Sequence, residues 1–230
     1  MKTLSKQKVV ESIALAVVIL CAGAVLFSVF EPVISRSQIN DTFTVRQQIG
    51  DEISFLLAAA DVSMSPAIQG LTGGQATGTT RVVVRSNSPT GYTLEMRFSD
   101  DPAMQGETTA GVINNYTPAA AGVPDFTFAS NSSGGAAEFA YTVNSSSTVD
   151  LDQSFLDNGS ACNTGSNQTT GRCWLNPSTT NELLIDRATS TPTGGATTTI
   201  VFQVEVPSSP SPAVPSDFYR ATATLTATNQ

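Results

Sequence analysis

The sequence predicts a mainly β protein, in which an N-terminal hydrophobic transmembrane helix precedes an antiparallel β-sandwich of the Ig-like or jelly-roll-like kind. Two observations carry this prediction. Residues 13–30 contain no charged side chain, and the chain after residue 60 consists of short segments in which polar and apolar residues alternate. Stretches rich in Gly, Pro, Asn and Ser separate these segments, of which about eight to ten are candidate strands. Many short strands joined by turns are typical of sandwiches.

The apolar stretch is long enough for a membrane span. A helix over residues 9–30 would extend roughly 30 Å at about 1.5 Å per residue, which matches the hydrocarbon core of a bilayer. The three lysines of the chain, at positions 2, 6 and 8, all precede it. Because positive residues stay in the cytoplasm, we expect a single-pass protein of the cell membrane with a cytoplasmic N-terminus and an extracytoplasmic C-terminal domain. The predicted organisation is a basic tail at 1–8, a transmembrane helix or signal-anchor at 9–31, a stalk or first strands at 32–60 and the sandwich domain at 61–230.

Other fates of the N-terminal segment stay open. Ala22 and Ala24 flank Gly23 in the small-x-small pattern that signal peptidase cuts, so the segment is alternatively a cleaved signal peptide. Against cleavage there, residues 25–30 remain hydrophobic. A lipoprotein signal with Cys21 as the lipidated residue is a third interpretation.

Glu11 suggests a further alternative. A short basic leader, a cleavage point and a glutamate at the fifth mature position ahead of a hydrophobic helix resemble the type IV pilins. Cleavage between Lys6 and Gln7 would place Glu11 at that position. The glycine that usually precedes the cleaved bond is missing. The resemblance covers about 30 residues and implies a filament subunit, whereas an acid at a helix start is also favoured by the helix dipole alone.

The alternating segments predict strands in the following order along the chain: 40–49, 52–57, 79–85, 92–98, 126–129, 139–143, 182–187, 197–206 and 218–227. A Pro/Gly loop at 86–91 predicts a hairpin of the third and fourth of these strands, and a turn at 131–135 predicts a second hairpin of the fifth and sixth. Residues 100–124 and 144–181 are expected to form long polar connections. No helix is expected after residue 60.

Two motifs carry a resemblance. Residues 86–94, SNSPTGYTL, look like the NxxxGYxL strand and turn of many uncharacterised bacterial surface proteins, and residues 219–227, YRATATLTA, are similar to the strand that closes them. WxL-type and spore-coat-like sandwiches share this layout. The resemblance covers residues 61–230 and implies an anchored cell-surface β-sandwich. No WxL tripeptide is present, so cell-wall binding is not carried over.

Cys162 and Cys173 bracket a loop rich in Gly, Asn and Thr. Outside the cytoplasm such a pair is expected to form a disulfide, with Cys21 left apart. The spacing fits neither a redox C-x-x-C motif nor a zinc knuckle. Trp174 follows directly and is expected to be a core residue, with a sugar-stacking platform as the alternative.

Composition excludes several functions. The chain contains no histidine, which removes Ser-His-Asp and Cys-His triads and His-ligated zinc. From residue 31 onward 18 acidic residues stand against 8 arginines, and such a surface repels phosphate, so nucleic-acid binding is not expected. The acidic groups at 100–101 and 150–157 match no calcium-loop motif and are expected to be solvated turn residues. We expect no catalytic residue, no metal site and no cofactor.

These observations predict a non-catalytic, membrane-anchored surface protein that acts in adhesion or as a structural or binding module of the cell envelope. Two alternatives remain: a type IV pilin-like filament subunit and a secreted carbohydrate-binding or carbohydrate-active domain. The expected partners are membrane lipid, glycans or proteins of the cell envelope or a host surface, and further copies of the chain.

Overall fold

The structure, a computed structural model, describes residues 6–29, 40–128 and 135–230. The chain forms two compact units, residues 1–48 and 49–230. The helix α1, Lys6–Val29, belongs to the first unit. The predicted transmembrane helix is not supported, because in the described ranges no helix combines the length and the apolar character that crossing a membrane requires. The predicted end of the membrane span, residues 30–31, lies outside the described residues.

The second unit is a β-structure, as the sequence predicts. Its described residues form ten strands: β1 Ile53–Leu57, β2 Gly74–Ser86, β3 Tyr92–Phe98, β4 Met104–Gly106, β5 Val112–Asn115, β6 Glu138–Ser145, β7 Glu182–Arg187, β8 Ala196–Val206, β9 Tyr219–Arg220 and β10 Ala223–Asn229. Two single-turn 3-10 helices, Thr148–Asp150 and Gln153–Phe155, are the only helical residues described after residue 60.

The strands form two curled sheets, as in a sandwich. A seven-stranded sheet has the order β1-β2-β8-β6-β5-β4-β9, and a three-stranded sheet has the order β10-β3-β7. The prediction of an antiparallel fold holds for every pair of named strands except one, because β5 and β6 run parallel. Residues 116–137 lie between these two strands, and a connection of that length lets a chain return to the starting end of a sheet.

Both predicted hairpins are wrong. The strands β2 and β3 follow each other around residues 86–91, yet they belong to different sheets. The strand β2 lies between β1 and β8 and pairs with β8 along eleven consecutive residue pairs, whereas β3 lies between β10 and β7. In the second case β6 forms, but residues 126–128 are not a strand, and most of the predicted turn lies outside the described residues.

Two further predicted strands differ from the structure. Residues 40–49 alternate as a strand would, but they form no paired strand in the chain. The final segment is divided: β9 pairs with β4 in the larger sheet, whereas β10 pairs with β3 in the smaller one. The chain therefore crosses between the sheets at Ala221 and Thr222.

Side chains of the two sheets meet in one core. In β3 the alternate residues Tyr92, Leu94, Met96 and Phe98 are buried, and their neighbours are less so. The ring of Phe98 packs edge-on against a phenylalanine of β6 in the opposite sheet, with ring centroids 5.8 Å apart. Burying a large apolar side chain contributes about 1.5–3 kcal/mol, so this alternation stabilises the sandwich along the whole strand.

The loop of residues 86–91 fastens two distant parts of the chain at one end of the β unit. The amide of Asn87 reaches residues 50–52, since Glu52 N donates to Asn87 Oδ1 (2.6 Å) and Asn87 Nδ2 donates to Gly50 O (3.1 Å). On the other side of the loop, Ser86 Oγ donates to Asn229 Oδ1 (2.6 Å). We call this end the proximal pole.

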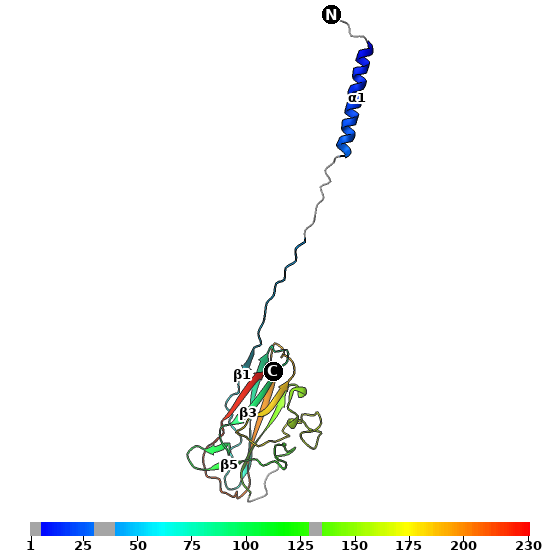
Figure 1. Cartoon of the computed structure of the whole chain (residues 1–230). Helices are drawn as coiled ribbons and strands as arrows, with labels where there is room; N and C mark the ends of the chain where they lie inside the picture. Colours follow the sequence, from blue (N-terminus) through cyan, green and yellow to red (C-terminus); the bar gives the residue numbers. More distant parts are fainter. Residues whose placement is uncertain (1–5, 30–39, 129–134) are drawn as a thin grey trace. The chain divides into compact units, whose positions relative to one another are not determined.

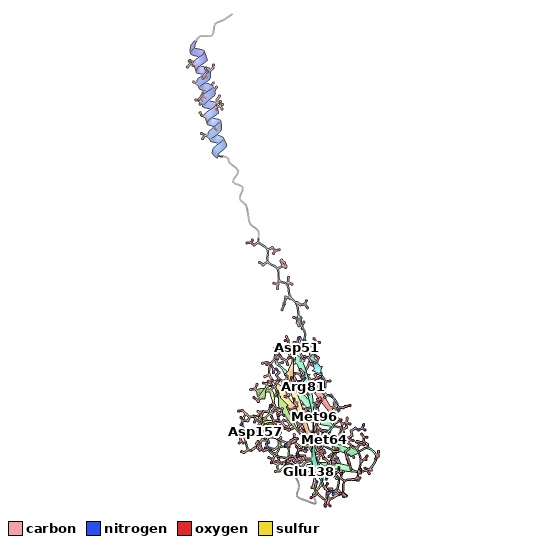
Figure 2. The ribbon with its side chains drawn as sticks, turned by 180° about the vertical axis from the view of Figure 1, so that it is seen from behind. Asp51, Met64, Arg81, Met96, Glu138 and Asp157 are labelled. Atoms are coloured by element: carbon pink, nitrogen blue, oxygen red, sulfur yellow. A yellow bond between two sulfur atoms is a disulfide. The ribbon has the colours of Figure 1, made fainter. Side chains whose placement is uncertain are left out.

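The opposite end, which we call the distal pole, contains residues 99–111 and 215–222. Figure 1 shows β1 and the last residue at one end of the β unit and β5 at the other. Figure 2 shows Asp51 and Glu138 at these two ends, with the buried Met96 between them.

Gly91 is required by this loop. Its φ is +88°, and a Cβ at this position would overlap the carbonyl oxygen of Arg187 in β7. Gly122 has a similar φ of +73°, but a Cβ there would meet no atom within 4 Å. A side chain would therefore strain the backbone at both positions, but only at Gly91 would it also collide with a neighbouring strand.

We expect Gly91→Ala to lower the free energy of unfolding by more than about 2 kcal/mol, because the added methyl group strains the backbone and displaces β7. The matched control, Gly122→Ala, should lose only about 1 kcal/mol, which is the cost of the positive φ alone. Urea denaturation of the full chain, followed by the fluorescence of the buried Trp174, measures both values. Equal losses in the two variants would contradict the proposed close approach.

Candidate functional site

The predicted disulfide is confirmed. Cys162 and Cys173 are joined, and both side chains lie in the hydrophobic core. Closing a loop of this length stabilises a fold by roughly 2–3 kcal/mol. Cys21 lies in α1 and is free. The bond has a structural role, because it holds a long polar connection against the sandwich.

Asp157 organises the loop that the disulfide closes. Its carboxylate accepts hydrogen bonds from Gly159 N (2.8 Å), Thr169 N (2.9 Å) and Thr169 Oγ1 (3.1 Å), and its side chain is fully buried. Burial by itself raises the pKa of the Asp157 carboxyl, but these hydrogen bonds outweigh it and hold the pKa below its ordinary value of 3.8. The expectation of a solvated turn residue is therefore wrong for Asp157. It is also wrong for Asp150, which is buried and forms an ion pair with Arg187.

Trp174 is a core residue and presents no platform to a sugar. Its side chain is 4% exposed, and Nε1 donates to Gly171 O (3.1 Å). The indole packs edge-on against Phe128, which in turn stacks on Tyr116 with ring centroids 4.7 Å apart. These rings cover the outer face of β6 at Ala140, so both faces of that strand are buried.

The three sequence-predicted residues of the N-terminal segment lie in α1. Glu11, Ala22 and Ala24 are all exposed on this helix. The helix begins at Lys6 and has no acidic residue in its first turn, so Glu11 lies too far along it for the helix dipole to account for the residue. The pilin-type interpretation of Glu11 stays a prediction. Cleavage at Ala22–Ala24 or before Gln7 stays a prediction.

A polar pocket at the distal pole was not predicted. It has a volume of about 350 Å³, and its lining comes from three places in the chain: Asp100, Gln105, Gly106, Glu107, Arg220 and Thr222. The pairing of β4 with β9 sets Gln105 opposite Arg220. Ser99 N donates to Thr222 O (2.9 Å), which holds the ends of β3 and β10 together beside the pocket.

Asp217 fastens one wall of this pocket. Its carboxylate accepts hydrogen bonds from the backbone N–H groups of Thr108 (2.9 Å) and Thr109 (2.7 Å) and from both of their hydroxyl groups (2.8 Å each). Desolvation raises the pKa of Asp217, but these four bonds outweigh it and hold the pKa well below the ordinary range. The loop after β4 is therefore tied to the segment before β9.

The pocket offers both donors and acceptors of hydrogen bonds. Arg220 Nε lies 3.9 Å from Glu107 Oε1, and both side chains are well exposed. Phe218, next to Asp217, has a ring that is 81% exposed. Within the residues that the structure describes, no group of three or more His, Cys, Asp or Glu side chains is placed to hold a metal ion. The guanidinium of Arg220, the carboxylates of Asp100 and Glu107 and the amide of Gln105 are groups that form hydrogen bonds with polar ligands.

Sequence reasoning noted Asp100 and missed the rest of the lining. Gln105 and Glu107 fall in a segment that was expected to be an unstructured connection, and Arg220 falls in an expected continuous strand. The pocket depends on the crossing of the chain between sheets at residues 221–222, for which the sequence carries no Gly or Pro signal.

Comparison of the chain with known protein families, with curated proteins and with solved structures finds no match. The resemblance carried by residues 86–94 and 219–227 accordingly stays an expectation from the sequence. The strands that these motifs enter are neighbours in the smaller sheet. The first motif supplies the first three residues of β3 and the second supplies five residues of β10, and Leu94 with Ala227 is the pair that joins one motif to the other.

We expect Asp157→Asn to lower the free energy of unfolding at neutral pH by about 1–3 kcal/mol, since the amide nitrogen cannot accept the bonds that the carboxylate accepts. Because the pKa of Asp157 is lowered in the folded protein, the stabilisation is present above about pH 4 and is lost as the pH falls through the folded-state pKa. The difference between wild type and variant should therefore shrink on acidification. Urea denaturation between pH 2 and pH 7 measures it.

The exposed Asp61 provides the control. Asp61→Asn should leave the stability within about 0.5 kcal/mol of wild type at every pH, as is usual for surface positions. A constant difference between wild type and Asp157→Asn down to the lowest pH would show that the charge of Asp157 is not what stabilises the loop.

Proposed function

We propose that the chain is a non-catalytic surface module of the cell envelope, carried by its N-terminal apolar segment and displayed outside the cytoplasm, which binds its partner at the distal pole. The β unit, in this proposal a sandwich of the Ig-like or jelly-roll-like kind, serves as a rigid scaffold for the distal loops. The observation that carries the proposal is the position of the pocket at the pole opposite residues 50–52, where the chain enters the β unit.

The location outside the cytoplasm rests on the disulfide. Cytosolic thiols are kept reduced, whereas a bond that is buried in the core and closes a long loop is typical of exported proteins. The three lysines that precede the apolar stretch agree with this direction of export.

The anchoring rests on the sequence. Residues 13–30 contain no charge, and a helix begins at Lys6 and continues to Val29. In a membrane-anchored protein this helix lies in lipid. In the pilin-like alternative the same helix packs against copies of itself, with Glu11 close to the new N-terminus after cleavage before Gln7.

A carbohydrate-binding function is the second candidate, and the exposed ring of Phe218 favours it. Aromatic rings stack on the apolar faces of sugars, and the polar lining of the pocket would bind hydroxyl groups. The absence of histidine in the sequence limits the catalytic alternative to a pair of carboxylates.

The mature N-terminus distinguishes the anchored protein from its rivals. We expect mass spectrometry of the chain, purified from the membrane fraction of its cells or of a bacterial host, to find residues 1–12 intact, because in this proposal the uncharged stretch 13–30 is retained as a signal-anchor. A chain that begins at Gln7 would instead establish the pilin-like subunit, and a chain that begins at Val25 would establish a secreted protein.

A thiol assay on the same sample provides the control for the compartment. One thiol per chain, that of Cys21, should react in urea without reductant, and three should react after reduction. Reactive thiols at Cys162 and Cys173 in the unreduced protein would place the chain in a reducing compartment and contradict the proposal.

The distal pocket is tested by binding. We expect the full chain to bind to isolated cell-envelope material or to a glycan array, and Arg220→Ala together with Gln105→Ala to weaken that binding at least tenfold, because both side chains line the pocket. Arg81→Ala is the matched control, since Arg81 is an exposed arginine of β2 away from the pocket (Figure 2). Equal binding by all variants would remove the function from this pocket.

A further inference from the structure

The strand β1 leaves one edge of the larger sheet open. It is the outermost strand of its sheet, and its only strand partner is β2. In the described part of the chain no strand pairs with its other edge. Phe55 of this strand is 39% exposed, although its neighbour across the ladder, Val84, is fully buried. An open edge with exposed apolar side chains is a template for a further strand.

Residues 40–49 have the composition of the strand that is missing there. Phe43, Val45 and Ile49 are each more than 80% exposed, and polar residues alternate with them. These residues form no strand within the chain, and the side-chain bond from Gln47 Nε2 to Gln48 O is the hydrogen bond that the structure shows among them. The segment thus has the alternating pattern of a strand but no neighbouring strand to pair with.

The apolar residues continue from this segment into β1 on one face. Alternate residues of an extended chain point the same way. Phe43, Val45, Ile49, Ile53 and Phe55 are all odd-numbered, and the polar Gln47 and Asp51 share this spacing. Ile53 and Phe55 pair with the buried Ser86 and Val84, so the side chains of these two residues lie on the core side of the larger sheet. The bulge after Phe55 ends the common face at that residue.

We propose that residues 43–55 of two copies of this chain pair antiparallel around a two-fold axis at Ile49. In this register Phe43 lies opposite Phe55 of the second copy, Val45 lies opposite Ile53, and Ile49 lies opposite itself. The added strand continues the larger sheet of each copy, and its apolar side chains cover the exposed edge of the partner's core.

The charges select the same register. Arg46 lies opposite Glu52 of the second copy, and two-fold symmetry produces this pair twice. A shift by two residues in one direction sets Asp51 opposite Val45, and a shift in the other direction sets it opposite Ile49. A shift by one residue places apolar side chains opposite the polar face. Residues 43–55 are thus complementary to themselves in the antiparallel direction. We therefore take a second copy of the chain as the partner that pairs with the open edge of β1.

Cysteine cross-linking tests the register in the full chain purified in detergent, with Cys21→Ala as background. Directly opposite residues have Cα atoms about 4.5–5.5 Å apart, a separation that suits a disulfide. Ile49→Cys should therefore form a covalent dimer on mild oxidation, whereas Val45→Cys, which lies opposite Ile53, should not. Cross-linking at both positions alike, or at neither, would overturn the register.

Charge reversal tests the association itself. Arg46→Glu alone and Glu52→Arg alone place like charges opposite each other twice, so each variant should dimerise at least tenfold more weakly than wild type in analytical ultracentrifugation. An equal mixture of the two variants restores both ion pairs and should recover the wild-type dissociation constant as a heterodimer.

The backbone contacts of residue 52 with Asn87 do not involve the side chain that is exchanged. A monomeric wild type, or an association that neither single variant changes, for example one made by α1, would overturn the proposal. Either result leaves the proposed surface function standing, because that function depends on the export of the chain and on the distal pocket.

Discussion

The fold depends on the pairing of β3 with β10. Seven consecutive residue pairs, from Tyr92 with Asn229 to Phe98 with Ala223, bring the last strand of the chain back to a strand near its middle. Without this ladder the smaller sheet would consist of β3 and β7 alone. The crossing between the sheets at residues 221–222 would not form either, and with it the wall of the distal pocket that Arg220 and Thr222 provide.

The first of the two recognisable motifs, residues 86–94, contributes to the fold at several of its positions. Tyr92 and Leu94 fill the core, Asn87 binds the segment before β1, and Gly91 allows the close approach of β7. Each of these residues has a structural reason to be present. Such motifs therefore report a fold, and a binding function has to be sought elsewhere in the molecule.

Local patterns predicted what local physics determines. The alternation in residues 92–98 and 197–206 located β3 and β8 to within one residue, because buried residues alternate along most of each strand. Residues 182–187 form β7 as predicted, although its two buried residues, Leu184 and Ile185, are adjacent. The cysteine pair was predictable from compartment and spacing. The partners of the strands were not, since the loop 86–91 has hairpin composition although its strands enter different sheets. Nor was the division at Ala221, where threonine and alanine suit either sheet. The roles of Asp157 and Asp217 could not be predicted for a related reason. Each carboxylate accepts hydrogen bonds from backbone N–H groups that lie far from it in the sequence.

The hydrogen bonds of Asn87 with residues 50 and 52 also have a mechanical consequence. The strand β1 leaves the proximal pole at residue 53 and runs toward the distal pole beside β2. A load that pulls on residue 50 and is resisted by a partner held at the distal pole acts along these strands. The hydrogen bonds of the β1–β2 ladder and those of Asn87 then share the force in shear, and they must break together rather than one after another. The part of the larger sheet next to residue 50 is therefore the part that first resists such a pull.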